Sequence, residues 1–515
     1  MNSMGYYPDV VHVTCPDCGR EYFHKDGEDD ECFACRDHGY RKAATVPRQI
    51  KAQRIGSLDH QADALTAGQA AAMDSLRAFA NRSPGTPNMM TLQGYAGTGK
   101  TYLMGVLLRE LGKSVRVAVA APTNKAVGVL QDKIGDATGA EFRSIHSFLG
   151  LRMSEREDGT MECKPGGLPS LHEYDLAIVD ECSMIGASLF EMIVTSSHGC
   201  RVLFVGDPAQ LPPVETKAIV AQESPTFSHV QRRAMLSEIV RQAAGNPIIA
   251  LSMRIRDAIE AGQPLRAHEL IEALPAGSES HVSVGYGGEA AIFNAALNAL
   301  QAGMDARIVA YTNAAVDAYN RALHAALYDS AMPFAVGERV IVNEQYDDAR
   351  AVGQAGLMFE KSRRVALYTS EEAMVEAIAP EVHPQYPAVP AYRVVLFRGE
   401  GASQVFGYVP ADRAAFEAEK SRLWGIWRQI KATEGTKGFN RQTCTAASQA
   451  AILFTKAFLP IRHVYAITAH KSQGSTIDTV IVDYNNLSKI KDPFTFNRSL
   501  YVAVTRAARF MVVIA

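Results

Sequence analysis

The stretch GYAGTGKT at residues 94–101 decides the fold, because it follows the pattern G-x-x-x-x-G-K-T. In such a loop the backbone N–H groups turn inward onto phosphate oxygens, and glycines stand where a side chain would block that approach. The segment NMMTLQG before the loop is typical of a buried strand, and TYLMGVLLREL after it has the apolar spacing of a helix. Strand, loop and helix in this order predict an α/β fold with a phosphate-binding loop rather than a glycine-rich turn.

Each residue type in the loop predicts a role at a bound nucleotide. Lys100 would reach the β and γ phosphate oxygens, and the Thr101 hydroxyl would be a ligand of Mg²⁺. The backbone amides of the loop, with the N-terminus of the following helix, would hold the phosphates. The residues expected to bind the nucleotide are Gly94, Ala96, Gly97, Thr98, Gly99, Lys100 and Thr101.

Composition is that of an ordinary globular protein with several domains. The chain has 515 residues, of which 47% are hydrophobic and 21% charged, and its formal net charge is −3. A basic groove can coexist with such a balance, so the net charge does not exclude a nucleic-acid partner. The sequence has no apolar run long enough to span a bilayer, and the segment MNSMGYYPDVVHV lacks a signal-peptide pattern. These features predict a cytoplasmic protein without a membrane partner.

Four of the eight cysteines form two C-x-x-C pairs near the N-terminus. Cys15, Cys18, Cys32 and Cys35 offer two thiolates on each of two tight turns, which suits tetrahedral Zn²⁺. His24 or His38 could replace one ligand, and disulfide pairing is the alternative, although a reducing cytoplasm disfavours it. Four thiolates leave no position for water, so the zinc would be structural. We expect a zinc module at about residues 1–45.

Acidic residues follow two further predicted strands. Asp180 and Glu181 come after YDLAIV, and Asp207 and Gln210 come after the strand at 201–205. The carboxyl end of a strand is where ligand groups gather in a parallel α/β sheet. Asp180 would hold Mg²⁺, and Glu181 would orient or deprotonate an attacking water. Each acidic pair alone could be a solvated strand end.

Ten blocks in order carry a family resemblance: LTAGQ, GYAGTGKT, APTNKAV, SIHSFLGL, VDECSMI, VGDPAQLPPV, LSEIVRQAAGNPII, YTNAAVDAYN, YAITAHKSQGST and LYVAVTRAARF. Over residues 60–515 the chain resembles the superfamily 1 helicases of the RecD-like and phage Dda-type branch. The resemblance implies two RecA-like motor domains with ATP in the cleft between them, and movement from 5′ to 3′ along single-stranded DNA. It also implies that Gln69 reads the adenine, that Gln210 senses the γ-phosphate, and that Arg241 and Arg506 reach that phosphate from the second domain. Gly474 would lie at the nucleotide as well.

The same resemblance implies a set of DNA contacts. Thr123 and Asn124 begin a predicted helix after the strand RVAVAA, where hydroxyl, amide and N–H groups suit a phosphate. These two residues are equally suited to helix N-capping, which is the preferred interpretation without the family. The full set of expected DNA-binding residues is Thr123, Asn124, His146, Thr312, Asn313, His470 and Lys471.

The motif order also predicts the domain bounds. Motor domain 1 would span residues 46–245, and motor domain 2 would combine residues 246–334 and 459–515. Asp158-Gly159 signals a hairpin at about 150–168. The resemblance implies that this hairpin is the strand-separating pin, and a surface decoration is the alternative. From about residue 335 to 458, the segments FAVGERVIVNEQ, RVALYT, AYRVVLFRG and QVFGYV are β-like, and the resemblance implies that they form a small SH3-like barrel. The helix that follows them carries Trp424 and Trp427, which could grip DNA or pack in a core.

The sequence therefore predicts an ATP-dependent DNA helicase with ATP, Mg²⁺ and Zn²⁺ as cofactors. Single-stranded and forked DNA are the expected partners of a monomer, and the zinc module would contact replication or recombination proteins. The alternatives are a translocase that remodels protein–DNA complexes without unwinding, and an RNA helicase of the same superfamily.

Overall fold

The computed structural model describes residues 10–14, 21–25, 65–81, 88–135, 139–155, 161–213, 223–238, 246–274, 281–328, 332–347, 365–399, 404–436 and 438–515. The chain divides into two compact units, Met1–Leu58 and Asp59–Ala515. In the first unit, β1 (Val10–Thr14) pairs with β2 (Glu21–Lys25) in antiparallel fashion. Cys15, Cys18, Cys32 and Cys35 lie outside the described residues, so the zinc module stays a prediction.

The phosphate-loop strand belongs to a six-stranded sheet in which every neighbouring pair is parallel. Its spatial order is β10 (Arg233–Leu236), β3 (Met89–Gly94), β9 (Arg201–Gly206), β8 (Leu176–Val179), β4 (Val117–Ala121) and β5 (Glu141–Ser144). A parallel sheet is covered by helices on both faces, which explains the unbroken apolar run VAVAA of β4. The α/β fold expected from the sequence is therefore confirmed.

The side chains of alternate residues in each strand point to opposite faces of this sheet. Val117 and Val119 pack with helices α2 (Ala67–Ala80), α3 (Lys100–Leu111) and α4 (Asn124–Ile134). Ala118 and Ala120 pack on the other face with the short helices α5 (Ile145–Phe148), α6 (Ala187–Ser196) and α7 (Pro225–Ser228). The 3₁₀ turns η1 (Gly112–Ser114), η3 (Leu171–Glu173) and η4 (Cys182–Met184) complete the connections.

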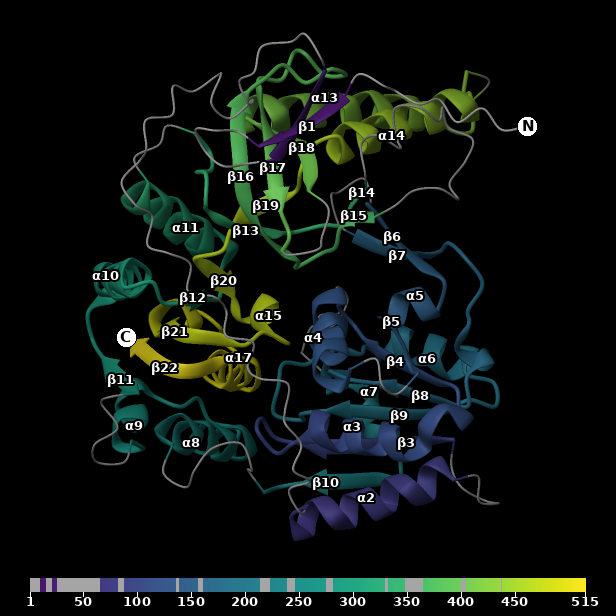
Figure 1. Cartoon of the computed structure of the whole chain (residues 1–515), viewed down its shortest axis with the longest axis vertical. Coiled ribbons are helices and arrows are strands. Elements are labelled where there is room, and N and C mark those ends of the chain that lie inside the picture. The colour runs from purple at the N-terminus through teal and green to yellow at the C-terminus, as the bar shows by residue number, and fades with distance from the viewer. Residues whose placement is uncertain are drawn as a thin grey trace. The chain divides into compact units, whose positions relative to one another are not determined.

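A second parallel sheet of five strands holds the later motifs. Its order is β11 (Val282–Gly285), β22 (Ala507–Ile514), β21 (Ile477–Asp483), β12 (Ala306–Ala310) and β20 (Ala466–Thr468). Helices α10 (Gly288–Gln301) and α11 (Asn313–Leu327) pack on one face. The other face carries α8 (Pro247–Ala261), α9 (Ala267–Glu272), α15 (Ala469–Ser472), α16 (Tyr484–Leu487) and α17 (Pro493–Thr505). The two parallel sheets are drawn in Figure 1.

The predicted hairpin is present as β6 (Leu151–Glu155) paired with β7 (Met161–Pro165). The predicted β insertion forms an antiparallel sheet ordered β18 (Val405–Pro410), β17 (Ala391–Phe397), β16 (Glu372–Pro380), β13 (Arg339–Val342) and β19 (Ile461–His463). A two-stranded pair, β14 (Tyr346–Asp347) and β15 (Val365–Leu367), lies in the same segment. The insertion was expected to end at residue 458, but β19 lies beyond that residue. It pairs with β13 and so forms the edge of this sheet.

Both tryptophans lie inside a helix pair. Trp424 and Trp427 of α13 (Arg413–Lys431) are each only 7% exposed, and they pack with Cys444 and Ala451 of α14 (Arg441–Lys456). The two helices lie side by side in Figure 1. The burial favours the packing alternative, since side chains in this position cannot stack on bases.

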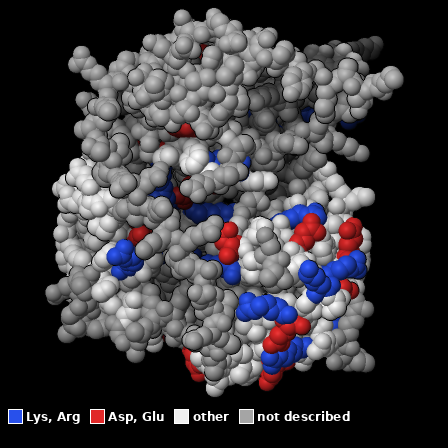
Figure 2. Space-filling view, viewed as in Figure 1, with Lys and Arg blue, Asp and Glu red and all other residues white. Residues whose placement is uncertain are grey.

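Charges of both signs mix on the surface. Figure 2 shows Lys and Arg side chains next to Asp and Glu side chains among the described residues of that face. Arg77, for example, pairs with Asp74 at 2.9 Å and with Glu110 at 2.6 Å. Within the described part of the chain, no helix combines the length and apolar character needed to cross a membrane.

Candidate nucleotide and nucleic-acid site

Neighbouring strands of the first sheet deliver the predicted nucleotide residues to one edge. β3 lies beside β9, with Gln93 opposite Gly206, and β9 lies beside β8, with Phe204 opposite Val179. The phosphate loop, Asp207 and Asp180 therefore follow three adjacent parallel strands at their carboxyl ends. This is the edge at which open α/β sheets bind ligands.

Two glycines of the phosphate loop adopt the left-handed conformation, with φ of 81° at Gly97 and 86° at Gly99. Gly94 is required for space, because a Cβ there would lie 2.7 Å from the Thr98 hydroxyl oxygen. Gly99 is equally confined, since its Cβ would lie 2.5 Å from the Gln69 side-chain nitrogen. The loop path thus depends on glycine, as its pattern predicts.

Lys100 lies across its own loop. Its Nζ donates to the carbonyl oxygen of Gly94 at 2.6 Å and to that of Tyr95 at 3.0 Å. Helix α3 begins at this residue, and its N-cap Gly99 supplies no side-chain cap. The first N–H groups of α3, which include that of Thr101, thus lack a side-chain cap at a helix N-terminus that favours anions. A lysine and uncapped amides together fit a polyphosphate.

The acidic pair at the end of β8, Asp180 and Glu181, combines an unusual backbone conformation with repulsion between two carboxylates. Glu181 has φ of 52°, a left-handed conformation that is rare outside glycine, and its N–H donates to Asp180 Oδ1 at 2.8 Å. Loss of solvent, reinforced by the charge of Glu181, raises the pKa of Asp180 to about 7. A divalent cation would relieve this repulsion, so the donor set fits Mg²⁺.

Residues of the second sheet contact this edge. The Tyr501 hydroxyl, on α17, donates to Asp207 Oδ2 at 2.8 Å and accepts from the Ala96 N–H at 3.2 Å. A Cβ on Gly474 would lie 3.9 Å from Glu181 Oε1, which places the predicted Gly474 beside the acidic pair. Groups from the two sheets therefore meet around the phosphate loop, as the resemblance implies.

The two glutamines occupy different surroundings. Gln69 is 4% exposed, and its side-chain nitrogen donates to the Thr98 carbonyl at 3.2 Å, while its amide oxygen caps α2 with Thr66. Gln210 is 5% exposed, and its side-chain oxygen has no hydrogen-bond partner among the described residues. It lines a small pocket with Ser183, Glu223 and Arg498. The role of Gln69 at adenine and that of Gln210 at the γ-phosphate stay predictions.

Of the two predicted arginines, the structure describes only Arg506. Arg241 lies outside the described residues. Arg506 is 7% exposed, and its guanidinium donates to the carbonyls of Val502 and Ser475, each at 3.3 Å, and to the Thr505 hydroxyl at 3.2 Å. The hydrogen bonds of Arg506 thus stay within the second sheet and its helices.

The two Thr-Asn pairs cap equivalent helices. Thr123 follows β4, and its hydroxyl accepts from Ala126 N–H at 3.2 Å at the start of α4. Thr312 follows β12, and its hydroxyl accepts from Ala315 N–H at 3.3 Å at the start of α11. Capping is therefore the observed role, and Asn124 and Asn313 are the first residues of the two helices.

Of the remaining predicted DNA residues, His146 and His470 are half-buried and Lys471 is exposed. Burial lowers the pKa of His146 and of His470, so both imidazoles are neutral at pH 7. Lys471 is exposed, and its Nζ donates to Asn343 Oδ1 at 3.2 Å. A neutral histidine would donate a hydrogen bond to a phosphate without forming an ion pair.

Three residues of the second part of the chain were not among the predicted site residues. Arg498 donates to the carbonyls of Pro208 and Gln210, the latter at 3.1 Å. The Arg256 guanidinium lies 3.7 Å from the centre of the Tyr95 ring. Tyr501 lies in the motif LYVAVTRAARF, and this motif could have identified it as a site residue. No pattern in the sequence marks Arg256.

Comparisons with known proteins agree with the motif order. Residues 64–275 match the model of an AAA domain, and residues 463–514 match that of a UvrD-like helicase C-terminal domain. The ATP-dependent RecD2 DNA helicase of Deinococcus radiodurans is 36% identical over 168 residues, which is 31% of this chain and 21% of that protein. The ATP-dependent DNA helicase dda of Enterobacteria phage T4 is 24% identical over 439 residues, covering 81% of this chain and 92% of that protein. A Pif1 helicase structure at forked duplex DNA is 17% identical, covers 88% of this chain and 92% of that one, and has a TM-score of 0.46.

Tyr501→Phe is expected to destabilise the fold by about 1–3 kcal/mol, because it removes the hydrogen bond to buried Asp207 Oδ2 and the acceptor of the Ala96 N–H. Burial and the neighbouring Asp207 carboxylate raise the pKa of Tyr501, so its hydroxyl keeps the proton it donates. Urea unfolding of the variant and the wild type measures the difference. Tyr368→Phe, at an exposed position, is the control, and equal midpoints for all three proteins would contradict the prediction.

Proposed function

We propose that this chain is an ATP-hydrolysing DNA helicase of the RecD, Dda and Pif1 type, as its family matches support, and that it moves 5′ to 3′ on single-stranded DNA and unwinds duplex DNA. One observation carries the proposal. The phosphate loop, the acidic pair and Asp207 share one sheet edge, and Tyr501 and Gly474 from the other sheet lie against them. Such an arrangement can couple the state of the bound nucleotide to how tightly each of the two parallel-sheet halves holds a DNA strand.

The residues at the edge suit phosphoryl transfer. Bound ATP and Mg²⁺ would supply the transferable phosphoryl group and the cationic charge. Lys100 would exchange its two loop carbonyls for phosphate oxygens, and Thr101 and Asp180 would hold the metal. Glu181, on its fixed left-handed backbone, would orient the attacking water and accept its proton. Gln210 and the arginines Arg241 and Arg506 would respond to the γ-phosphate.

Two side chains would carry a change at the nucleotide to the second sheet. Tyr501 links Asp207 and the Ala96 N–H to α17, and Arg498 of the same helix holds the carbonyls of Pro208 and Gln210. The proposed DNA contacts of that half, Thr312, Asn313, His470 and Lys471, follow β12 and β20 of its sheet. Those of the first half are Thr123, Asn124 and His146. Alternating grip between the two sets would turn hydrolysis into a step.

ATP turnover with single-stranded DNA, with single-stranded RNA and without nucleic acid tests this proposal. We expect stimulation by DNA, and unwinding of duplexes that carry a 5′ tail. Unwinding only from a 3′ tail would contradict the direction. DNA-stimulated turnover without unwinding would favour a translocase that remodels protein–DNA complexes, and stimulation by RNA alone would favour an RNA helicase.

We propose that the β6–β7 hairpin separates the strands of the duplex. Deleting residues 156–160 and rejoining the strands should reduce unwinding of forked DNA and leave movement along single strands intact, because the proposed phosphate contacts lie elsewhere. Helicase assays on forked DNA and DNA-stimulated ATP turnover measure the two activities. An equal loss of both would show that the hairpin supports the motor and does not part base pairs.

We also propose that Cys15, Cys18, Cys32 and Cys35 bind one structural Zn²⁺, and that this module contacts replication or recombination proteins. Cys15→Ser with Cys18→Ser should release about one zinc per chain and unfold the module. ATP turnover should persist, because the proposed nucleotide residues all lie in the second unit. Metal analysis and turnover assays measure both effects, and loss of turnover by a folded motor would contradict a separable module.

The proposed enzyme is a cytoplasmic monomer, and the small inserted sheet would close as an SH3-like barrel.

A further inference from the structure

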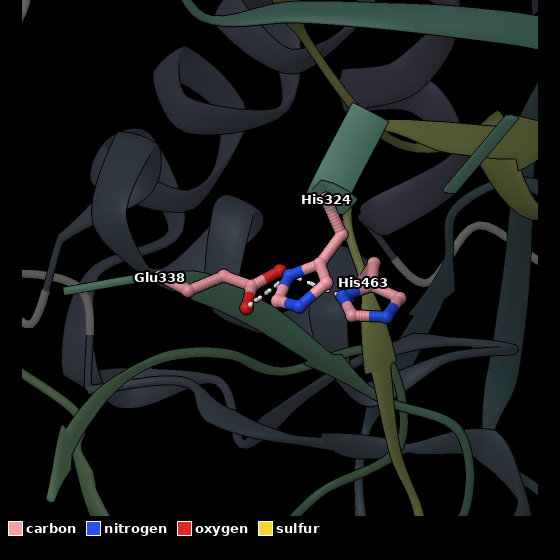
Figure 3. A group of neighbouring side chains, drawn as sticks. All are labelled: His324, Glu338 and His463. Carbon is pink, nitrogen blue, oxygen red and sulfur yellow. Dashed lines mark hydrogen bonds and ion pairs between the residues drawn. The ribbon is translucent and has the colours of Figure 1, made fainter. Parts of the chain in front are cut away.

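Three titratable side chains that the proposed mechanism does not use meet where α11 approaches the inserted sheet. His324 comes from α11, Glu338 immediately precedes β13, and His463 ends β19. Figure 3 shows both imidazole rings directed at the single carboxylate. Their potential ligand atoms all lie within 4.8 Å of one another. The cluster therefore joins one helix of the second parallel sheet to two strands of the antiparallel sheet.

Glu338 is fully buried and is held in a fixed orientation. Its Oε2 accepts from the Ala335 N–H at 2.9 Å, and its Oε1 accepts from the Tyr465 hydroxyl at 2.9 Å. His463 Nδ1 lies 2.6 Å from Oε1. The carboxylate is thus held in place and aimed at the two rings.

The hydrogen bonding of His324 leaves one nitrogen unexplained. Its Nε2 lies 3.2 Å from the Met332 carbonyl oxygen, and a carbonyl can only accept, so Nε2 carries a proton. Nδ1 lies 3.1 Å from Glu338 Oε2, and it has no hydrogen-bond partner among the described residues. His324 is 8% exposed, so solvent does not satisfy this atom. A positive charge between Nδ1 and the carboxylate would satisfy both groups, and either a proton on Nδ1 or a metal ion would supply it.

We propose that His324, Glu338 and His463 bind a transition-metal ion of the zinc class, which fixes the inserted sheet to the second parallel sheet. Two imidazole nitrogens with one carboxylate oxygen form a ligand set that zinc accepts, whereas Mg²⁺ and Ca²⁺ prefer oxygen alone. The Met332 carbonyl on His324 Nε2 and the Tyr465 hydroxyl on Glu338 are the outer partners that orient metal ligands.

The observed spacing is close to what the metal needs. Tetrahedral bonds of about 2.0–2.1 Å separate neighbouring ligand atoms by roughly 3.3 Å. His324 Nδ1 is 3.1 Å from Glu338 Oε2, and His463 Nδ1 is 2.6 Å from Glu338 Oε1. Small rotations of the His463 ring would admit the ion. The metal would therefore add a cross-link between α11 and the two paired strands β13 and β19 of the inserted sheet.

Metal stoichiometry of the full chain tests the proposal. The Cys15→Ser, Cys18→Ser protein serves as the starting point, so that the proposed N-terminal zinc does not contribute. After chelation, reloading with Zn²⁺ and gel filtration, we expect about one equivalent of zinc in this protein and none when His324→Gln is added. Zn²⁺ should also raise the thermal unfolding midpoint of the first protein and not that of the second.

His383→Gln is the matched control. His383 is a buried histidine of the same inserted segment, but its Nδ1 accepts from the N–H groups of Gln385 and Tyr386, and its Nε2 contacts the Ala457 carbonyl. This change should leave the zinc content unaltered. Equal zinc in the His324→Gln and control proteins would overturn the proposal.

A measurement without any change at the cluster covers the case in which the variants fail to fold. Co²⁺ added to the Cys15→Ser, Cys18→Ser protein should give visible absorption bands of a tetrahedral site with nitrogen and oxygen ligands. Absence of these bands and of bound zinc would overturn the proposal and would assign a proton to His324 Nδ1 as the charge that faces Glu338.

Discussion

Glu181→Gln is expected to lower kcat for ATP hydrolysis by about 10²–10⁴-fold, the range for loss of a positioned general base. The amide keeps the size and the left-handed backbone position of Glu181, but it cannot accept the proton of water. Besides burial, the negative charge of Glu181 raises the pKa of Asp180, and the substitution removes that charge, so Asp180 ionises more readily as the proposed Mg²⁺ ligand. Binding of Mg²⁺ and ATP should therefore be kept. Single-turnover hydrolysis with saturating single-stranded DNA measures the chemical step, and fluorescence titration measures nucleotide affinity.

The control for this substitution is Glu173→Gln, which removes a carboxylate of the same half from an exposed 3₁₀ turn. It should leave both kcat and affinity at the wild-type values. A Glu181→Gln enzyme with near wild-type turnover would remove Glu181 from the proposed mechanism. A loss confined to nucleotide affinity would instead make Glu181 a binding residue.

The placement of the proposed nucleotide residues at one sheet edge could be predicted because each of them belongs to a short motif that follows a strand. The loop around Lys100 is one continuous motif, and Asp180 and Asp207 each follow an apolar strand. Parallel strands bring their carboxyl ends to one edge, so motif and strand together place these side chains. The adjacency of β3, β9 and β8 was not predicted from the sequence, and the structure supplies it through the sheet order.

Contacts between distant segments could not be predicted in this way. Arg256 meets Tyr95, and Arg498 meets the carbonyl of Gln210, across more than a hundred residues of chain. Packing of helices decides such pairs, and helix spacing alone does not identify the partner. The left-handed backbone of Glu181 was equally hidden, because residues other than glycine rarely adopt it and no pattern marks the exception.

The inserted sheet shows the same limit. Its strands β13, β17 and β18 fall in segments predicted as β-like, but β16 and β19 were missed. β16 has the sequence EAMVEAIAP, in which alanine and glutamate weaken the strand signal, and the three residues of β19 are too few for a period. His324, Glu338 and His463 converge only because β19 closes the edge beside β13.

Arg506→Ala is expected to reduce kcat for ATP hydrolysis by about 10³-fold, the effect of losing an arginine that stabilises the γ-phosphoryl transition state. Its guanidinium now donates to the Val502 and Ser475 carbonyls, so reaching the phosphate requires these bonds to be exchanged as the nucleotide draws the two halves together. The loss should therefore appear in the chemical step, with ATP and DNA affinity near wild type.

Two variants separate this role from a structural one. Arg506→Lys keeps a positive charge without the planar fork, so it should recover only part of the rate if the guanidinium contacts the phosphate. Arg509→Ala removes an exposed arginine three residues later and should leave single-turnover hydrolysis unchanged. The buried hydrogen bonds of Arg506 also stabilise the fold, so thermal unfolding must be measured on each variant. If Arg506→Ala lowers the unfolding midpoint but hydrolyses ATP at a near wild-type rate, Arg506 supports the α17 terminus and is not a catalytic residue.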